Sequence, residues 1–235
     1  MYGWRGRLGL IVSSSNATME MELHDYLPEG VSLQTTRVPL GYVTEEELLR
    51  MNALAVEGAR LLGDVELLLY GCTTCSIIGG KDYEKKLEMA IEEEVNVPVI
   101  STGTAVVEAL KILDAREIIV VTPYTEEINA REREFLEANE FTVLDIRGLG
   151  FSEHGAIGRL EPYTAYRLAK ASFTDEAEAI FISSTNWRTF EIIEALENDL
   201  GVPVVTSNQA SLWLALREMD VMEKIPELGR LLTEY

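Results

Sequence analysis

Continuously apolar runs alternate with amphipathic segments along the whole chain. The runs LGLIV, VELLLYG, EIIVV and EAIFIS are apolar at nearly every position, which is typical of strands covered on both faces. Eight strands are predicted, at residues 8–12, 32–38, 66–70, 97–101, 117–121, 142–146, 179–183 and 202–206. Eight helices are predicted, at residues 18–26, 44–62, 83–94, 104–113, 125–139, 163–173, 189–200 and 210–218. This alternation predicts parallel sheets with right-handed crossovers.

Two long stretches of the chain repeat one another. Residues 65–110 and 178–216 each contain an apolar run, a Cys/Ser/Thr cluster, an amphipathic helix, the tripeptide VPV, a second Ser/Thr loop and another helix. Residues 8–41 parallel residues 118–150 in the same way. The sequence therefore predicts a duplicated architecture.

The repeat divides the chain into two α/β halves. We place the first at residues 1–113 and the second at residues 114–216, and we interpret residues 217–235 as a C-terminal helical return across them. A duplicated unit commonly places its equivalent loops on opposite sides of one cleft. Those loops carry Cys72 in the first copy and Ser184 in the second, and we expect the functional site between them.

Four loops that follow predicted strands are rich in hydroxyl groups. They are SSSN at 13–16, GCTTCS at 71–76, TPYT at 122–125 and SSTN at 183–186. In open parallel sheets, ligands bind beyond the carboxyl ends of the strands. Hydroxyl donors and backbone N–H groups near helix N-termini favour a carboxylate ligand, without any buried lysine.

Composition and charge restrict the classes of partner. The 235 residues include 40 acidic and 20 basic side chains, a formal net charge of −20 at pH 7. A chain this acidic is not expected to bind nucleic acid or an anionic membrane. No apolar run approaches the roughly 18 residues of a membrane span, and the N-terminal apolar patch is shorter than a signal-peptide core. We expect a cytoplasmic protein with a solvated acidic surface; adaptation to high salt is a second interpretation.

The chain has two cysteines, Cys72 and Cys75, in a C-x-x-C pattern. A structural zinc site normally requires four ligands, and no second C-x-x-C or histidine pair completes one. The two histidines, His24 and His154, lie far apart in the sequence. We therefore expect no metal. A redox pair remains an alternative, and we interpret Cys75 as a packing residue.

A thiol near a helix N-terminus has a lowered pKa and can act as a nucleophile or a carbon base. A Cys72 thiolate that adds to a cis-enedioate would turn the double bond into a single bond, about which the adduct can rotate before elimination gives the trans product. Hydroxyl and backbone N–H donors would stabilise the enediolate intermediate. The alternative is that Cys72 is a small buried apolar residue.

Six segments together resemble one enzyme group. They are SSSNATMEMEL, GCTTCS, VTPYTEEIN, GAIGRLEPYTAY, SSTNWRTFEII and VPVVTSNQASLW. The chain resembles the maleate cis–trans isomerase and arylmalonate decarboxylase group of the aspartate/glutamate racemase superfamily. This resemblance implies two pseudo-symmetric α/β halves, no metal or organic cofactor, and a substrate flanked by one cysteine from each half. We also expect a homo-oligomer.

The resemblance assigns roles to residues in three of the loops. Cys72 stands where the group has its first catalytic cysteine, and Thr73 and Thr74 would donate to a substrate carboxylate. Asn16 matches a substrate-binding asparagine, although an N-cap role competes with this interpretation. Tyr124 matches a tyrosine that hydrogen-bonds the other end of the substrate.

Two positions depart from the pattern of the group. Ser184 stands where the second cysteine would be, with Thr185 beside it as a further candidate for substrate binding. His154 stands where the isomerases carry another asparagine, and it is either a substrate-binding residue or a plain loop residue. A serine hydroxyl is a far poorer acid or base than a thiol at neutral pH. Proton shuttling between two cysteines is therefore not expected.

From these observations we predict an α/β fold of two pseudo-symmetric, parallel, four-stranded Rossmann-like halves with the active site in the cleft between them. The predicted function is cofactor-independent isomerisation of a small dicarboxylate, maleate to fumarate, through a Cys72 thiolate adduct with Ser184 as its partner. Two alternatives stay open. One is a decarboxylase, racemase or ectoine-utilisation-like enzyme that uses Cys72 for proton transfer. The other is a carboxylate-binding protein that has lost its activity.

Overall fold

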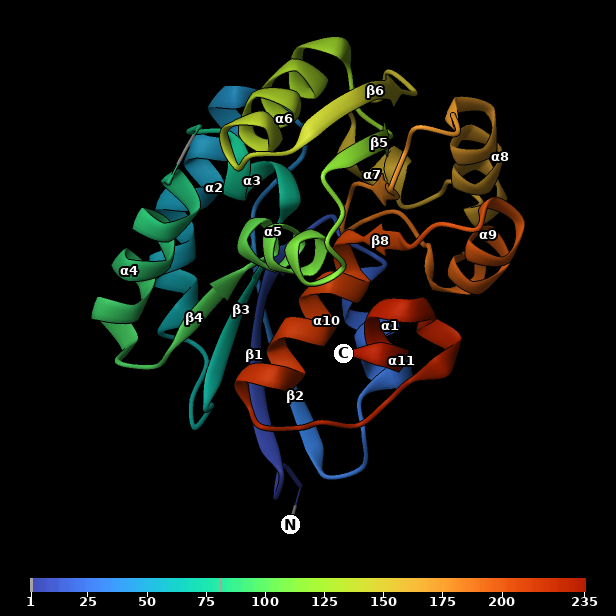
Figure 1. The fold of residues 1–235 in the computed structure, drawn as a ribbon. Helices are drawn as coiled ribbons and strands as arrows, with labels where there is room; N and C mark the ends of the chain where they lie inside the picture. Colours follow the sequence, from blue (N-terminus) through green and yellow to red (C-terminus); the bar gives the residue numbers. More distant parts are fainter. Residues whose placement is uncertain (1, 81) are drawn as a thin grey trace.

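Two four-stranded parallel sheets lie at the centre of the computed structural model, which describes residues 2–80 and 82–235 (Figure 1). The first sheet has the order β2-β1-β3-β4 and the second has the equivalent order β6-β5-β7-β8. The strands are β1 (Gly6–Ser13), β2 (Val31–Val38), β3 (Leu67–Gly71), β4 (Val99–Ser101), β5 (Glu117–Thr122), β6 (Thr142–Gly148), β7 (Ala179–Ile182) and β8 (Val204–Thr206). Because the two orders match, the predicted α/β fold with two pseudo-symmetric parallel sheets is confirmed.

Helices connect the strands and cover the sheets. In the first half they are α1 (Met19–Tyr26), α2 (Glu45–Ala59), α3 (Thr73–Ile77), α4 (Tyr83–Val95) and α5 (Thr102–Ile112). The rest are α6 (Glu126–Ala138), α7 (His154–Ile157), α8 (Pro162–Ser172), η1 (Phe190–Ile192), α9 (Ile193–Leu200), α10 (Ser207–Glu218), η2 (Pro226–Leu228) and α11 (Gly229–Glu234). All eight predicted helices are present, and α11 lies within the segment interpreted as a C-terminal helical return, whereas the short helices α3 and α7 were not predicted. Within the described residues, no helix is long and apolar enough to cross a membrane.

Polar residues at the ends of the short strands start the helices that follow. Ser101 ends β4, and its side chain accepts a hydrogen bond from the N–H of Thr104 at 3.2 Å, which caps α5. Thr206 ends β8 and forms a reciprocal capping box with Gln209 at the start of α10. Such a box satisfies two backbone donors that a helix start otherwise leaves free. Equivalent positions of the two halves are therefore built in the same way.

The two halves pack against each other through α5 and α10, which lie side by side between the sheets (Figure 1). Ser211 on α10 meets Thr102 on α5, with 3.1 Å between the hydroxyl oxygens. Every residue of α10 from Ser207 to Leu216 is buried. The interface is therefore part of one continuous core, which holds the loops of the two halves in a fixed relation.

The C-terminal segment lies mainly on the second half. Helix α11 packs against α9, α10 and β8, and the Leu228 carbonyl accepts a hydrogen bond from the side chain of Gln209 at 2.7 Å. An ion pair between Glu223 and Arg5 at 2.6 Å reaches the first half. Residues 217–235 therefore pack against the start of α10 and contact Arg5, just before β1.

Candidate active site

The loops that follow β1, β3, β5 and β7 meet between the two sheets. The segments after these strands carry seven of the eight side chains that the sequence singled out, and the eighth, His154, begins α7 after β6; each of the eight residues is at most 4% exposed. The set comprises Asn16, Cys72, Thr73, Thr74, Tyr124, His154, Ser184 and Thr185. Such a cluster of buried polar groups, drawn from both halves, is what the duplication predicts.

Cys72 lies at the N-cap position of α3, directly after β3. Its sulfur accepts a hydrogen bond from the backbone N–H of Cys75 at 3.3 Å and lies 3.7 Å from the hydroxyl oxygen of Thr74. Burial opposes ionisation of the thiol, but hydrogen bonds from the Cys75 thiol, the Cys75 N–H and the Thr74 hydroxyl outweigh it and lower the pKa of Cys72. Cys72 is therefore more readily ionised than an ordinary thiol, which suits a nucleophile.

Cys75 occupies a different environment, one turn further along. Its thiol lies 3.4 Å from the sulfur of Met51, and the residue is fully buried. Burial raises the pKa of Cys75, and its hydrogen bond to Cys72 raises it further. The neutral thiol of Cys75 therefore supports the thiolate of Cys72.

The difference in pKa predicts selective alkylation. We expect iodoacetamide near pH 7 to modify Cys72 at least about tenfold faster than Cys75, because only the thiolate reacts. Peptide mapping by mass spectrometry after timed exposure measures both rates. Cys75→Ala is the matched control, and it should also slow the reaction at Cys72 because it removes the donor thiol. Equal rates at the two positions would contradict the assignment.

Ser184 begins the loop after β7 with a φ of 120°, a conformation that non-glycine residues rarely adopt. Its backbone N–H donates to the Ser207 hydroxyl at 3.0 Å, and the same oxygen accepts from the Thr73 hydroxyl at 2.9 Å. Ser207 thus ties the loop of the first half to the loop of the second. Ser207 lies in the second Ser/Thr loop of the repeat, but its residue type and position alone did not predict a place in the site.

Both backbone polar groups of Tyr124 are hydrogen-bonded, which fixes the position of the residue. Its N–H donates to the Thr122 hydroxyl at 3.0 Å, and its carbonyl accepts from the Gly150 N–H at 2.9 Å. Burial raises the pKa of the Tyr124 phenol well above its usual value, and the nearby Glu132 and Cys72 raise it further. The phenol therefore keeps its proton and can act as a hydrogen-bond donor in the site.

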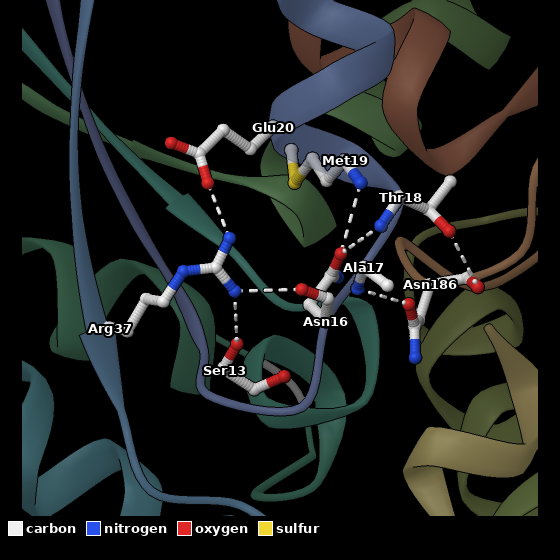
Figure 2. Close-up of polar contacts among 8 residues, drawn as sticks. All are labelled: Ser13, Asn16, Ala17, Thr18, Met19, Glu20, Arg37 and Asn186. Carbon is white, nitrogen blue, oxygen red and sulfur yellow. Dashed lines mark hydrogen bonds and ion pairs between the residues drawn. The ribbon is translucent and has the colours of Figure 1, made fainter.

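Asn16 supports the start of α1, as one of its two interpretations predicts, and its role in substrate binding stays a prediction (Figure 2). Its side-chain oxygen accepts from the backbone N–H groups of Thr18 and Met19, at 2.9 Å each, and so caps α1. Its amide nitrogen donates to the Thr185 hydroxyl at 3.1 Å, across the boundary between the halves. Arg37 holds the Asn16 carbonyl at 2.7 Å. The amide is thus oriented with its donor face toward the second half.

Asn186 and His154 form a further link between the halves. The Asn186 side-chain oxygen accepts from the Ala17 N–H at 2.8 Å (Figure 2), and its amide nitrogen donates to the His154 carbonyl at 2.8 Å. The His154 ring lies 2.9 Å from the Ser15 hydroxyl. Burial lowers the pKa of His154 to about 4, so its ring is neutral at neutral pH. Asn186 belongs to the hydroxyl-rich SSTN loop but was not predicted as a site residue.

The segment after β2 closes over this cluster. The Leu40 carbonyl accepts from the Ser15 hydroxyl at 2.5 Å, and the Gly41 carbonyl accepts from the His154 N–H at 3.0 Å. The Val43 N–H donates to the Ser152 carbonyl at 2.7 Å. These contacts tie the segment after β2 to the loop after β1 and to the start of α7, beside the buried candidate side chains.

Glu22 joins α1 to the second half. One carboxyl oxygen accepts from the N–H groups of Thr189 at 2.7 Å and Phe190 at 3.2 Å, and the other accepts from the Asn208 side chain at 2.5 Å. Burial raises the pKa of Glu22 to about 7, although these hydrogen bonds partly offset it. Glu22 is therefore a contact between the halves whose charge changes near neutral pH.

The ionisation of Glu22 predicts a loss of stability as the pH rises. Below pH 4.5, the ordinary pKa of a glutamate, the Glu22 carboxyl group is protonated in both the folded and the unfolded protein. Between pH 4.5 and about 7 it loses its proton only in the unfolded protein, so the unfolded state becomes more favourable as the pH rises. The full loss is about 3 kcal/mol. Glu22→Gln cannot ionise, so we expect its stability relative to the parent to be about 2 kcal/mol higher at pH 8 than at pH 5.

Urea unfolding at the two pH values measures this difference. Glu29→Gln, a substitution at an exposed position, serves as the control and should show no such change. A stability difference for Glu22→Gln that is the same at both pH values would show that Glu22 does not titrate with folding.

Metal ligands are not gathered at the site. Among residues 2–80 and 82–235, no group of three or more His, Cys, Asp or Glu side chains is placed to hold a metal ion. The groups that converge are a thiol, hydroxyls, amides, a phenol and a neutral imidazole. These can bind a carboxylate, stabilise an enediolate and supply a nucleophile.

The fold and the site define a class of α/β enzyme with two equivalent halves and a cysteine nucleophile. The sequence model of the arylmalonate decarboxylase family matches residues 8–232. The chain belongs to the arylmalonate decarboxylase family, which confirms the resemblance seen in the sequence.

Individual relatives carry two activities. The chain is 30% identical to a maleate isomerase of Nocardia farcinica, over 97% of this chain and 96% of the relative. It is 30% identical to an arylmalonate decarboxylase of Bordetella bronchiseptica, over 83% of each. A solved structure of a Nocardia farcinica maleate cis–trans isomerase mutant, in which serine replaces a cysteine, holds a covalently bound succinylcysteine intermediate; it matches with a TM-score of 0.93 and 28% identity, over 98% of this chain and 99% of the other.

Proposed function

We propose that this protein is a cofactor-independent isomerase that converts maleate to fumarate through a covalent adduct on Cys72. The observation that carries the proposal is the Cys72 thiol, whose pKa is lowered by hydrogen bonds from Cys75 and from the Thr74 hydroxyl. The likeness to maleate isomerases over nearly the whole chain supports it.

The proposed reaction begins when the Cys72 thiolate adds to one alkene carbon of maleate. A carbon–sulfur bond forms, the π bond breaks, and its electron pair passes into the neighbouring carboxylate as an enediolate. The remaining carbon–carbon single bond rotates. The electron pair then returns, the carbon–sulfur bond breaks, and fumarate leaves with the thiolate regenerated. Atoms and charge balance without an oxidant or a net proton.

The surrounding groups divide the binding of the two carboxylates. We assign Thr73 and Thr74, beside the nucleophile, to one carboxylate, and Asn16 and Tyr124 to the other. The donors that face the enediolate stabilise charge that develops during the addition, which is where such groups contribute most to rate. Thr185 holds the Asn16 amide, and His154 lines the same boundary.

Ser184 limits proton transfer on the side of the site opposite Cys72. A thiol opposite Cys72 could add or remove a proton at carbon, whereas a serine hydroxyl is a poor acid and base. We therefore propose that Ser184 acts as a hydrogen-bond partner and that the enediolate route needs no second thiol. The succinylcysteine found in the Nocardia relative with serine in place of a cysteine supports an adduct at such a site.

Proton NMR of maleate incubated with the protein tests the proposal. We expect fumarate to form, and mass spectrometry of the quenched protein to show one added mass of maleic acid on the peptide with Cys72. Ser184→Cys is the informative variant. Fumarate from Ser184→Cys alone would mean that the site is of the isomerase type but that Ser184 disables it; maleate left unchanged by both would contradict the proposed reaction.

A decarboxylase is the second candidate function. The 30% identity to the Bordetella enzyme favours it, and Cys72 would then deliver a proton to the enediolate that remains after loss of carbon dioxide. Release of carbon dioxide from phenylmalonate, measured in parallel with the maleate assay, separates the two functions. Saturable binding of maleate without turnover would indicate a carboxylate-binding protein that has lost its activity.

We also propose that the protein is cytoplasmic and works as a homo-oligomer of two-half subunits, divided near residues 113 and 216. Analytical ultracentrifugation of the purified protein measures the oligomeric state.

A further inference from the structure

The two sheets end in four edge strands, and three of these are poorly suited to further pairing. The edge strands β4 and β8 have three residues each. The edge strand β6 has a register shift against β5 between Ile118 and Ile119, and it carries the ion pair of Asp145 with Arg147. Short length, irregular register and charge are the usual means by which a protein prevents pairing along a sheet edge.

The fourth edge strand, β2, is long, regular and nearly uncharged (Figure 1). Its eight residues, VSLQTTRV, pair with β1 in one unbroken register, and residues 31–35 are all partly exposed. The single charged residue of the strand, Arg37, directs its side chain to the carbonyls of Ser13 and Asn16 and to Glu20. An edge of this kind is a template for another strand, so its exposure requires an explanation.

The hydrogen-bonding groups at the free edge of β2 follow from its pairing with β1. The Val38 carbonyl accepts from the Ser14 N–H at 2.8 Å, so the backbone polar groups of Val38 face β1. In a strand, the N–H and C=O of one residue point to one side and those of the next residue to the other. The backbone polar groups of Leu33, Thr35 and Arg37 therefore face away from β1, and within the described part of the chain none of them is hydrogen-bonded.

These three outward residues match a second copy of the same strand. When two β2 strands run antiparallel about a two-fold axis, one register sets Thr35 opposite its own copy and Leu33 opposite the partner's Arg37. In that register all three outward residues fall in pairs that exchange two backbone hydrogen bonds each. No like charges face each other, because β2 has a single charged residue. The edge is therefore complementary to itself, as a two-fold interface requires.

Charge also favours this edge as the place where two copies meet. Each copy has a formal net charge of −20, so two copies repel one another except where acidic side chains are few or paired. Residues 30–43, which include β2, contain no acidic residue. Two acidic residues beside the strand, Glu20 and Asp64, form ion pairs with Arg37 and Arg7.

Exposed aromatic residues continue the edge at both ends of β2. The Trp4 ring packs over Gly30, directly before the strand, and Trp4 is 66% exposed. Tyr42, four residues after the strand, is 57% exposed. Antiparallel pairing brings the start of one β2 toward the end of the other, and so Trp4 of one copy toward the partner's Tyr42. Aromatic residues are enriched in protein interfaces, which agrees with this arrangement.

We propose that β2 is the interface of a homodimer, in which the β2 strands of two copies pair antiparallel and join their first sheets into one continuous sheet. The interface rests on the proposed homo-oligomer and names the surface through which it forms; it does not depend on the reaction at Cys72. Pairing also anchors the strand that positions Asn16, since the Asn16 carbonyl accepts from the Arg37 side chain at 2.7 Å.

Thr35→Pro tests the pairing directly. The N–H that proline lacks faces outward, so the hydrogen bonds between β2 and β1 are kept, and edge strands tolerate proline for this reason. We expect sedimentation equilibrium to show a dimer for the parent and a dissociation constant about 100-fold higher or more for Thr35→Pro. Thr35→Val is the matched control. It keeps the N–H and removes only a hydroxyl that has no hydrogen-bond partner among the described residues, so it should dimerise as the parent does.

The outcomes distinguish the interface from the assembly. A monomeric parent would contradict both the homo-oligomer and the β2 interface, whatever happens to maleate. An oligomer that Thr35→Pro leaves intact would contradict the β2 interface alone. So would a Thr35→Val variant that dissociates as readily as Thr35→Pro, because the outward N–H would then not be the group that matters.

Residue-resolved hydrogen exchange of the parent needs no substitution. The N–H groups of Ser32 and Gln34 face β1 and should exchange slowly at every protein concentration. Those of Leu33 and Arg37 face outward, and we expect them to exchange slowly in the dimer and about tenfold faster or more on dilution to the monomer. Fast exchange of the outward N–H groups in an oligomeric parent would overturn the β2 interface, even if Thr35→Pro failed to fold.

Discussion

Replacing Cys72 with serine should abolish conversion of maleate to fumarate, with a loss of about 10⁴-fold or more in kcat. The thiolate is the proposed nucleophile, and removing a nucleophile leaves only the contribution of binding and charge stabilisation. In the parent protein the Cys72 sulfur caps α3 by accepting a hydrogen bond from the Cys75 N–H at 3.3 Å. Serine is chosen because its oxygen can accept the same hydrogen bond. The variant should therefore keep the fold and lose the chemistry. Proton NMR measures turnover, and mass spectrometry checks that the adduct is absent.

Two companions make this result specific. Cys75→Ala removes the neighbouring thiol and should lower the rate much less, since Cys75 contacts Met51 rather than the substrate. Cys72→Ala should lose activity as Cys72→Ser does. It should also lower thermal stability, because the Cys75 N–H then has no acceptor; the loss of such a helix cap costs about 1 kcal/mol. Residual turnover in Cys72→Ser near the level of the parent would refute the adduct mechanism.

Asn16→Asp should lower kcat/KM for maleate by about 100-fold or more without destabilising α1. The carboxylate still accepts from the N–H groups of Thr18 and Met19, and a negative charge at a helix start is favourable. The same substitution replaces the amide donor that faces Thr185 with an anion, which repels the substrate carboxylate. Steady-state kinetics and thermal unfolding are measured on the same preparation.

Asn16→Ala is the matched comparison for this prediction. It removes both the cap and the donor, so it should lower the melting temperature as well as kcat/KM. If Asn16→Asp retained the catalytic efficiency of the parent, Asn16 would be a structural cap, and its proposed role in binding would be withdrawn.

The local elements of this protein were readable from its sequence. Buried parallel strands are apolar at successive positions, so every strand was found, and the repeat showed that the two sheets have one plan. The start of α10 was placed three residues late, at 210, because Ser207, Asn208 and Gln209 look like a loop. They are helical because Thr206 and Gln209 form a capping box and the core buries all three polar side chains. Helices α3 and α7 have five and four residues, too few to show a helical period.

The chemistry was readable where residue type and strand end coincide. Cys72, Ser184 and the hydroxyl-rich loops follow from that rule, since the carboxyl ends of parallel strands meet at one edge of a sheet. Ser207 and Asn186 did not stand out, because nothing in their local sequence distinguishes them from caps and surface residues. Their partners lie far along the chain: Asn186 bonds Ala17, 169 positions away.

The sequence by itself determined the strands, the helices, the duplicated plan and the loops that carry reactive groups, because these depend on neighbouring residues and on a short period. The tertiary structure alone decided which polar groups meet and which stay charged. Burial and hydrogen bonds to residues far along the chain set the pKa values of Glu22 and His154, and both arise only when the two halves pack, whereas Cys72 combines burial with hydrogen bonds from its own loop. A pKa reflects the loss of water and the partners that replace it, and neither is written in the local sequence.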